Sequence, residues 1–275
     1  MARATTRFFF LLGDPVTHSL SPVFQNAALE SLGLDGIYLT LRVTAEELPA
    51  VMRSAARAGG GNVTVPHKER AAAALDVASP TVERTGACNT FWWDESRGLC
   101  GDNTDVEGFR AAARALLPSG LRGRRVLLLG AGGAARAVAV ACLEDEAAAV
   151  HLLNRTTERA RALKAALGTS ATVRVAEDAA AIAAETYDLA VNATPLGWAT
   201  DDPAPLDLRA PPRVGAVLDL TYGPTDTPWV REARRRGLPA ADGREMLVRQ
   251  GAAAFRRWWD REPPLDVMRA AVGLE

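Results

Sequence analysis

The feature that most constrains the fold is a glycine-rich turn between a short apolar run and an alanine-rich segment. Residues 126–129 (Val-Leu-Leu-Leu) read as a buried strand and lead directly into residues 130–136 (Gly-Ala-Gly-Gly-Ala-Ala-Arg). This is a G-x-G-x-x-[G/A] pattern, with Gly130, Gly132 and Ala135 in the small positions, which permit a tight turn and close approach of a pyrophosphate. The helix N-terminus after the turn would attract that anion. We therefore predict a dinucleotide site; the alternative is a turn that binds nothing.

The end of the next predicted strand, 148–153, indicates which dinucleotide binds. A fold that binds NAD usually carries an acidic residue here, which hydrogen-bonds the ribose 2′-hydroxyl. This chain has Asn154-Arg155-Thr156, with Arg159 one helical turn later. Guanidinium groups pair with phosphate bidentately and keep their charge. The sequence therefore favours NADP over NAD, and the alternative is a surface arginine in an arginine-rich chain.

Short apolar runs alternate with longer alanine-rich segments from Phe8 to about Ile182, a pattern typical of βαβ units and parallel sheets. Pro118-Ser119-Gly120 interrupts it, and we place a domain boundary between about 105 and 123. The chain is long enough for two ordinary domains. The predicted strands are 7–12, 36–42 and 61–65, and the predicted helices are 22–32, 45–58, 68–78 and 105–117.

Composition excludes several classes of protein. Lys and Arg total 32 against 33 Asp and Glu, so the chain lacks the basic field of a nucleic-acid binder. No stretch reaches the roughly 18 apolar residues of a membrane span, and the run 8–12 is too short for a signal peptide. The cysteines Cys88, Cys100 and Cys142 lack CxxC spacing, and three histidines are scattered. We therefore expect no metal site and a cytoplasmic protein.

Four polar clusters separate apolar segments of the first half, at residues 18–22, 61–68, 86–90 and 101–105. Residues just past the carboxyl ends of parallel strands line the ligand crevice of such folds. The clusters supply hydroxyls, amides, one lysine and an aspartate, a set suited to a small polyhydroxylated anion. Each cluster alone is equally typical of a turn, and Ser21-Pro22 is also a plausible helix start with Ser21 as N-cap.

In this order, the clusters resemble the shikimate dehydrogenase family, and the resemblance covers nearly the whole chain. It continues through 130–136, 154–156, 192–197 (Asn-Ala-Thr-Pro-Leu-Gly), 219–224 and 243–251. The resemblance implies NADPH-dependent, reversible reduction of 3-dehydroshikimate to shikimate, in the biosynthesis of chorismate and the aromatic amino acids. It implies an α/β protein with an N-terminal substrate domain (1–105), joined by C-terminal helices (244–275), a Rossmann-type NADP-binding domain (106–243) and a cleft between them.

The resemblance also assigns roles to residues. Lys68 and Asp105 match the catalytic pair. The substrate-binding positions are Ser19, Ser21, Thr64, Lys68, Asn89, Asp105, Tyr222 and Gln250. The cofactor-binding positions are Gly130, Ala131, Gly132, Gly133, Ala134, Asn154, Arg155, Thr156, Arg159, Thr194, Leu220 and Gly243. We read His18, His67, Cys88 and Cys100 as structural.

The chemistry of ketone reduction needs a hydride on carbon and a proton on oxygen. The proton donor must reach the carbonyl oxygen, and the Lys68 ammonium can donate this proton or stabilise the developing alkoxide. Four alternatives stay open: a quinate/shikimate dehydrogenase, an aminoshikimate-type enzyme, a folate-type dehydrogenase and a catalytically silent dinucleotide-binding sensor. Ser21, where a threonine would fit a quinate enzyme, favours shikimate. We expect a small-molecule substrate, no nucleic acid or membrane partner, and a monomer or homodimer.

Overall fold

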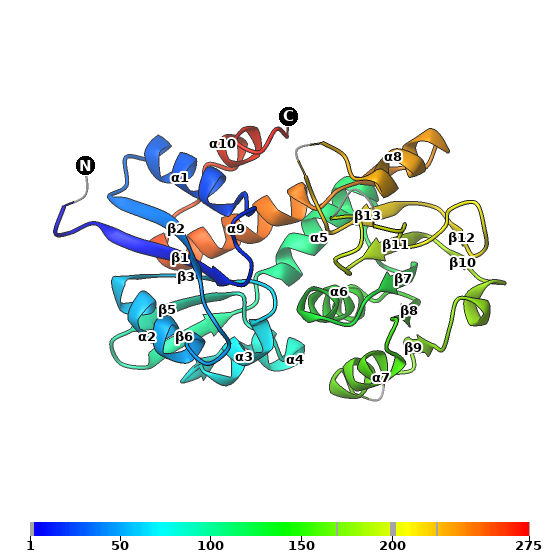
Figure 1. The fold of residues 1–275 in the computed structure, drawn as a ribbon, viewed down its shortest axis with the longest axis horizontal. Helices are drawn as coiled ribbons and strands as arrows, with labels where there is room; N and C mark the ends of the chain where they lie inside the picture. The colour runs from blue at the N-terminus through cyan, green and yellow to red at the C-terminus, as the bar shows by residue number, and fades with distance from the viewer. Residues whose placement is uncertain (1–2, 169, 199–201, 224, 275) are drawn as a thin grey trace. The chain divides into compact units, whose positions relative to one another are not determined.

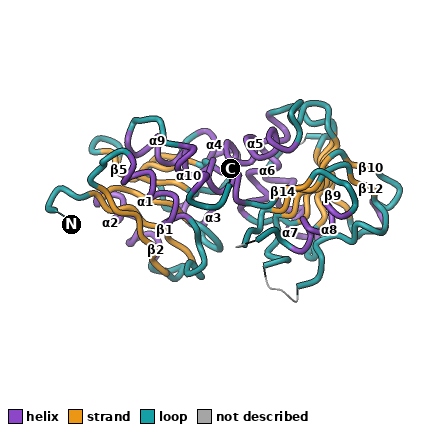
Figure 2. The backbone as a smooth tube through the Cα atoms, turned by 90° about the horizontal axis from the view of Figure 1, so that it is seen from above, coloured by secondary structure: helices purple, strands orange, loops and turns teal. Residues whose placement is uncertain are grey.

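The computed structural model describes residues 3–168, 170–198, 202–223 and 225–274. The chain divides into two compact units, Met1–Gly108 with Leu247–Glu275, and Phe109–Met246. Each unit is built on a six-stranded sheet, and Figure 2 shows the strands of each unit gathered into one layer with helices around it. Within the described ranges, no helix is long and apolar enough to cross a membrane.

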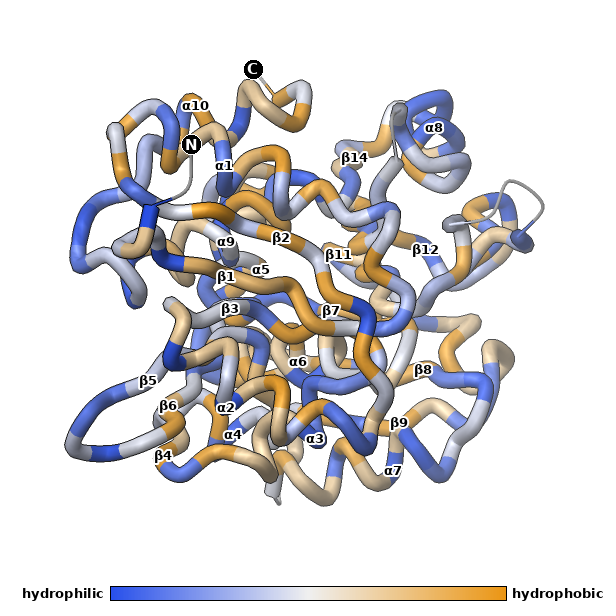
Figure 3. The backbone as a smooth tube through the Cα atoms, turned by 60° about the vertical axis from the view of Figure 1, so that its left-hand side comes forward, coloured by the Kyte–Doolittle hydropathy of each residue, from blue (hydrophilic) through white to orange (hydrophobic). Residues whose placement is uncertain are grey.

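The first sheet is mixed, in the order β2-β1-β3-β5-β6-β4. Its first strand, β1 (Arg7–Gly13), pairs in parallel with β2 (Gly36–Arg42) and β3 (Gly59–Val63). Strand β5 (Thr90–Asp94) is antiparallel to both β3 and β6 (Gly98–Asp102). The hydrophobic colour of β1 in Figure 3 follows the apolar run that the sequence marked as a buried strand. The remaining elements of this unit are β4 (Val77–Ala78), α1 (Ser21–Ser31), α2 (Leu48–Ala58), α3 (Lys68–Ala73), α4 (Pro80–Thr85), α9 (Arg244–Trp259) from Leu247 onward, and α10 (Leu265–Ala270).

The C-terminal helices pack on α1. Phe24 and Ala28 of α1 share a buried apolar cluster with Val248 and Phe255 of α9 and Met268 of α10. Figure 1 shows α1 and α10 side by side. A hydrogen bond of 2.9 Å from Gln25 Nε2 to the carbonyl of Gly251 adds a polar tie. The last part of the chain is therefore built into the unit that contains its first strand.

Several sequence predictions for this unit were wrong. The predicted helix 68–78 ends at Ala73, and Val77–Ala78 is instead a strand that pairs with β6. Asp76 explains the change, because its backbone N–H and its carboxylate both hydrogen-bond the backbone of Leu99, so sheet pairing overrides the helix propensity of the alanines. The sheet is not all parallel either. Strands β5 and β6 form an antiparallel hairpin that the sequence patterns did not predict.

Three further details also differ from prediction. The predicted strand 61–65 is β3, Gly59–Val63, so it begins and ends two residues earlier than predicted. Ser21 is not the N-cap of α1: the cap is Leu20, without a side-chain hydrogen bond, and Ser21 is the first helical residue. The predicted helix 45–58 begins only at Leu48.

The second sheet is parallel throughout, in the order β14-β13-β11-β7-β8-β9. Read from β9, this is the 3-2-1-4-5-6 order of a Rossmann fold, with β7 (Arg125–Leu129) as the first strand. The predicted Rossmann-type domain is confirmed. Its other elements are α5 (Asp105–Leu116), which begins in the first unit, α6 (Gly133–Glu144), β8 (Ala149–Leu153), α7 (Thr157–Ala166), β9 (Val173–Ala176), η1 (Ala180–Ile182), β10 (Thr186–Tyr187), β11 (Leu189–Asn192), β12 (Arg213–Val214), β13 (Val217–Asp219), α8 (Pro228–Arg235) and β14 (Ala240–Ala241).

Candidate active site

Lys68 and Asp105 form a largely buried ion pair in the first unit. Lys68 is the first residue of α3 and Asp105 the first residue of α5, and the Lys68 Nζ lies 2.6 Å from Asp105 Oδ2. Their side chains are 14% and 5% exposed. The N-terminus of α5 favours the carboxylate because unpaired helix N–H groups carry partial positive charge. The pair is therefore a hydrogen-bond donor and acceptor that are largely shielded from water, which strengthens the attraction between them.

Asn89 connects this ion pair to helix α9 by hydrogen bonds. Its side-chain amide, 2% exposed, donates to Asp105 Oδ1 at 2.9 Å and to Gln250 Oε1 at 3.1 Å. Gln250 donates in turn to the carbonyl of Leu247 at 2.7 Å. The structure thus brings together four residues predicted to act in the site, although 161 residues separate Asn89 from Gln250. Both carboxylate oxygens of Asp105 have a donor before any substrate binds.

Ser19, Ser21 and Thr64 also belong to the first unit but lie outside this hydrogen-bonded group. The backbone N–H of Ser21 donates to Ser19 Oγ at 3.2 Å, and Ser21 is buried while Ser19 is half-buried. Thr64 follows β3, is half-buried and donates its N–H to the carbonyl of Leu12. Among the described residues, no hydrogen bond joins these three to Lys68 or Asp105. Their contact with a substrate stays a prediction.

Sequence reasoning missed the residues that orient Asn89. Its Oδ1 accepts from the Thr104 N–H at 2.8 Å, from Thr104 Oγ1 at 3.1 Å and from Thr90 Oγ1 at 3.0 Å. Both threonines are buried. Both lie within the polar clusters of the sequence, but neither was predicted to act in the site. The available signal was a hydroxyl directly beside each predicted site residue, Asn89-Thr90 and Thr104-Asp105.

Three of the four residues read as structural, His67, Cys88 and Cys100, are buried. The ring of His67 is buried, with Nε2 2.8 Å from the carbonyl of Val43. His18 is exposed. Burial raises the pKa of Cys88 to about 12, so its thiol stays protonated at neutral pH and is a poor nucleophile. Burial also raises the pKa of Cys100. In the described part of the chain, no group of His, Cys, Asp or Glu could hold a metal ion.

The glycine-rich turn of the second unit fits a dinucleotide. Gly130 has φ +112°, and a Cβ built on it would lie 2.8 Å from the carbonyl oxygen of Ala193, so this position requires glycine. A Cβ on Gly132 would meet no atom within 4 Å, which leaves open space above the backbone. Gly132 is also the N-cap of α6 and offers no side-chain acceptor to its first N–H groups. Buried Ala131 and half-buried Gly133 and Ala134 complete the turn. An anion at this turn would find free donors.

The residues predicted to bind the 2′-phosphate of NADP lie just after the end of β8 and at the start of α7, and most of them are exposed. Asn154 Nδ2 donates to the carbonyl of Thr156 at 2.7 Å, which shapes the turn after β8. Arg155, Thr156 and Arg159 are all exposed. Within the ranges that the structure describes, neither arginine has an ion-pair partner, whereas Arg161 in the same helix pairs with Glu177. Two uncompensated guanidinium groups suit a 2′-phosphate.

Three further cofactor positions, Thr194, Leu220 and Gly243, lie on the turns after β11, β13 and β14. Asn192 Oδ1 accepts from the N–H and the hydroxyl of Thr194, at 3.0 and 2.7 Å. Asn192 also donates to Asp219 Oδ1 at 2.8 Å, and burial raises the pKa of Asp219. A Cβ on Gly243 would lie 2.3 Å from the carbonyl oxygen of Leu220, so the two predicted residues are in contact and the position requires glycine. Tyr222 is half-buried in this unit, and its contact with substrate stays a prediction.

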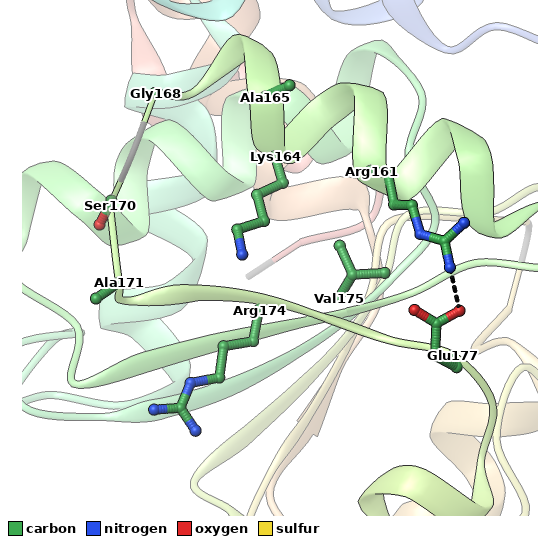
Figure 4. A pocket seen from close by; sticks show the side chains of 9 residues that line it. All are labelled: Arg161, Lys164, Ala165, Gly168, Ser170, Ala171, Arg174, Val175 and Glu177. Carbon is green, nitrogen blue, oxygen red and sulfur yellow. Dashed lines mark hydrogen bonds and ion pairs between the residues drawn. The ribbon is translucent and has the colours of Figure 1, made fainter.

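A separate cavity of about 840 Å³ lies between α7 and β9 (Figure 4). Arg161, Lys164 and Arg174 line it, and the dashed line in the figure marks the ion pair of Arg161 with Glu177. None of the predicted site residues lines this cavity. It is therefore distinct from the candidate cofactor turn.

Three family models match consecutive parts of the chain. They are the shikimate dehydrogenase substrate binding domain over residues 11–91, shikimate / quinate 5-dehydrogenase over 111–196, and the shikimate 5′-dehydrogenase C-terminal domain over 243–272. The chain is 42% identical to shikimate dehydrogenase (NADP(+)) of Moorella thermoacetica, covering 98% of this chain and 95% of the relative. It is 43% identical to the enzyme of that name from Rubrobacter xylanophilus, covering 96% and 95%. Among solved structures, shikimate 5-dehydrogenase from Thermus thermophilus in complex with NADP(H) and shikimate is 41% identical, with TM-score 0.84 and coverage of 97% and 98%.

Proposed function

Because the chain belongs to the shikimate dehydrogenase family, we propose that its first unit binds shikimate or 3-dehydroshikimate and its second unit binds NADP. The chain is an NADP-dependent oxidoreductase, and its reaction is the reversible reduction of 3-dehydroshikimate to shikimate in the biosynthesis of aromatic amino acids. When bound, NADPH supplies the hydride for the carbonyl carbon. The residues of this chain must then bind the substrate and handle one proton.

The observation that supports this proposal is the ion pair between Lys68 and Asp105 in the first unit. Lys68 Nζ holds a proton that it gives to the carbonyl oxygen during reduction and takes back during oxidation. Its positive charge also stabilises the oxygen while negative charge develops there. Asp105 fixes the position of Nζ through the 2.6 Å contact. Arginine could not replace this lysine, because a guanidinium does not release its proton at ordinary pH.

The neighbouring polar groups suit the rest of the substrate. Asn89 and Gln250 present an amide pair beside the ion pair, which suits ring hydroxyls. Ser19 and Ser21 offer hydroxyls for a carboxylate, since Ser19 Oγ already accepts from the Ser21 backbone and can donate its own hydrogen outward. The exposed guanidinium groups of Arg155 and Arg159 would bind the 2′-phosphate of NADP.

A four-way assay tests the function. The purified protein is mixed with shikimate or quinate and with NADP or NAD, and nicotinamide reduction is followed by absorbance. Shikimate with NADP should give the highest kcat/KM. Faster turnover of quinate with NAD would overturn the assignment. Binding of shikimate and NADP by calorimetry without any turnover would instead identify a silent sensor, and a parallel reaction with aminoshikimate tests the aminoshikimate-type alternative.

The cytoplasmic location and the monomeric or homodimeric state are proposals of a different kind, since they rest on the cysteine content and the family. Light scattering after size-exclusion chromatography tests the second. A mass near the 29.2 kDa of one chain or near twice that value agrees with the proposal, and a larger assembly contradicts it.

A further inference from the structure

A chain of buried hydrogen bonds leads from the candidate active site into the sheet of the first unit. The hydroxyl of Tyr38 donates to Asn62 Oδ1 at 2.7 Å. Asn62 Nδ2 donates to the carbonyl of Asn89 at 3.0 Å and to Thr90 Oγ1 at 2.9 Å. Thr90 Oγ1 then donates to Asn89 Oδ1 at 3.0 Å. These four side chains are at most 4% exposed, so water does not substitute for a lost partner at low cost.

The direction of this chain is fixed by its donors and acceptors. The Asn62 amide cannot be turned over, because its Oδ1 would then face the carbonyl oxygen of Asn89. The Asn62 NH₂ group therefore donates to Thr90 Oγ1. The single hydroxyl hydrogen of Thr90 then points toward Asn89 Oδ1 and Thr104 Oγ1. Asn62 and Thr90 are also opposite each other in the β3–β5 ladder, so the sheet itself holds them together.

The far end of the chain of bonds is the Asn89 amide, whose orientation decides what Asp105 meets. With its oxygen held by Thr90 and Thr104, Asn89 turns its NH₂ group toward Asp105 Oδ1 and Gln250 Oε1. In the opposite orientation, an amide oxygen would face two acceptors. A correctly placed Asn89 thus fixes one oxygen of Asp105, and the other oxygen holds Lys68 Nζ at 2.6 Å.

We propose that Thr90 is a positioning residue: backed by Asn62 and Tyr38, it holds Asn89 so that Asp105 keeps Lys68 in the position for proton transfer. Thr90 touches neither Lys68 nor Asp105 by any hydrogen bond among the described residues, so it acts through Asn89. The proposal rests on the proposed function, because it assumes that Lys68 transfers the proton. It adds residues that the predicted site does not contain.

The test compares Thr90→Val with Thr90→Ser. Valine keeps the shape and removes the hydroxyl, whereas serine keeps the hydroxyl. Misplacement of a reacting group by a fraction of an ångström is costly, so we expect Thr90→Val to lower kcat for shikimate oxidation with NADP by roughly 10-fold with KM changed less than about 2-fold, and Thr90→Ser to retain most of kcat. Tyr38→Phe, two hydrogen bonds further from Asn89 than Thr90, should lower kcat by about 3-fold.

Tyr187→Phe is the matched control, because it removes another buried tyrosine hydroxyl, 2.6 Å from His151 Nδ1, in the second unit. It should lower the melting temperature and leave kcat unchanged. Wild-type kcat in folded Thr90→Val, or an equal loss of kcat in Tyr187→Phe, would overturn the proposal. If Thr90→Val does not fold, Tyr38→Phe takes its place, and an unchanged kcat there counts against the proposal in the same way.

A double-variant cycle separates positioning from general damage. If Thr90 acts through Asp105, Thr90→Val combined with Asp105→Asn should be no slower than Asp105→Asn alone; additive losses contradict the proposal. A readout independent of turnover is NMR hydrogen exchange of the Asn89 side-chain amide, protected in the wild type and exposed in Thr90→Val. A wild type that does not turn over shikimate rejects the proposed function, while unchanged amide protection in Thr90→Val rejects the positioning role.

Discussion

The candidate sites of the two units are built in opposite ways. In the first, the candidate site is a group of buried side chains whose donors and acceptors are already paired, as at Asp105 and Asn89. In the second, the candidate site is backbone and exposed charge, with open space above Gly132 and an exposed Arg155 without an ion pair among the described residues. A proton donor must be held within a fraction of an ångström, whereas a cofactor that comes and goes must find donors that are free.

The difference teaches where each kind of site tolerates change. A paired and buried network loses function when a partner is removed, even if the ligand still binds. An open turn loses affinity when its space or charge is changed, even if the fold is untouched. The predictions below therefore separate kcat from affinity and both from stability.

The largest effect is expected at Lys68. Lys68→Ala should lower kcat by about 10³-fold, within the range of general acid–base catalysis, while shikimate affinity by calorimetry changes only a few-fold. The sequence has one other lysine, Lys164, so Lys164→Ala is the natural control and should keep wild-type kcat. A Lys68→Ala variant that changes only KM would make Lys68 a binding residue and remove the contrast between the units.

The next largest effect is expected at Arg155. Arg155→Glu replaces an attractive charge by a repulsive one, so KM for NADP should rise by roughly 100-fold while KM for NAD changes little. Arg174→Ala, an exposed arginine of β9, is the control and should leave both values unchanged. Equal losses with NADP and NAD would mean that Arg155 does not bind the 2′-phosphate.

A third prediction separates two glycines of the same turn. Gly132→Ala places a methyl group in open space, so the melting temperature should be unchanged while KM for NADP rises by about 10-fold, because the methyl group occupies room for the pyrophosphate. Gly130→Ala should instead lower the melting temperature, since its Cβ would clash with Ala193 at positive φ. The reverse pattern in calorimetric melting and steady-state kinetics would contradict the assignment of the open space to the cofactor.

The smallest effect is a pH dependence of stability in the second unit. Burial lowers the pKa of His151, so its neutral form stabilises the fold fully above the unfolded pKa of about 6.5, and this contribution is lost as the pH falls through the lower folded value. The melting temperature should therefore fall by a few degrees between pH 7.5 and 5, and by less in His151→Gln. An equal fall in both proteins would show that His151 does not cause it.

Local patterns predicted the second unit well. The run 126–129 and the turn after it specify a buried strand, a tight turn and a helix within about 20 residues, and Arg155 follows at the end of the next strand. Each of these features is short-range, so the sequence shows it directly. The parallel order of the strands also follows from the alternation of strand and helix.

The first unit was predicted less well because its decisive contacts are long-range. Strand β4 lies in an alanine-rich stretch, and only its pairing with β6 makes it a strand. Three helices and the loop before β5 bring together Lys68, Asp105, Gln250 and Asn89. No spacing in the sequence reveals this, and the family resemblance alone selected these residues. Neither the local patterns nor the family resemblance selected Thr90. Its side chain belongs to no predicted site, and its hydroxyl hydrogen-bonds Asn89 Oδ1. The roles of these residues stay predictions.

The contact between Asn89 and Gln250 has a consequence for folding during synthesis on the ribosome. Synthesis proceeds from the N-terminus, so Lys68, Asn89 and Asp105 emerge early, and the whole of Phe109–Met246 is made before Gln250 appears. Until α9 packs on α1, the Asn89 amide lacks one of its two acceptors. A nascent chain can therefore complete its candidate cofactor-binding unit, but its candidate proton-transfer site is finished only after Gln250 has been made.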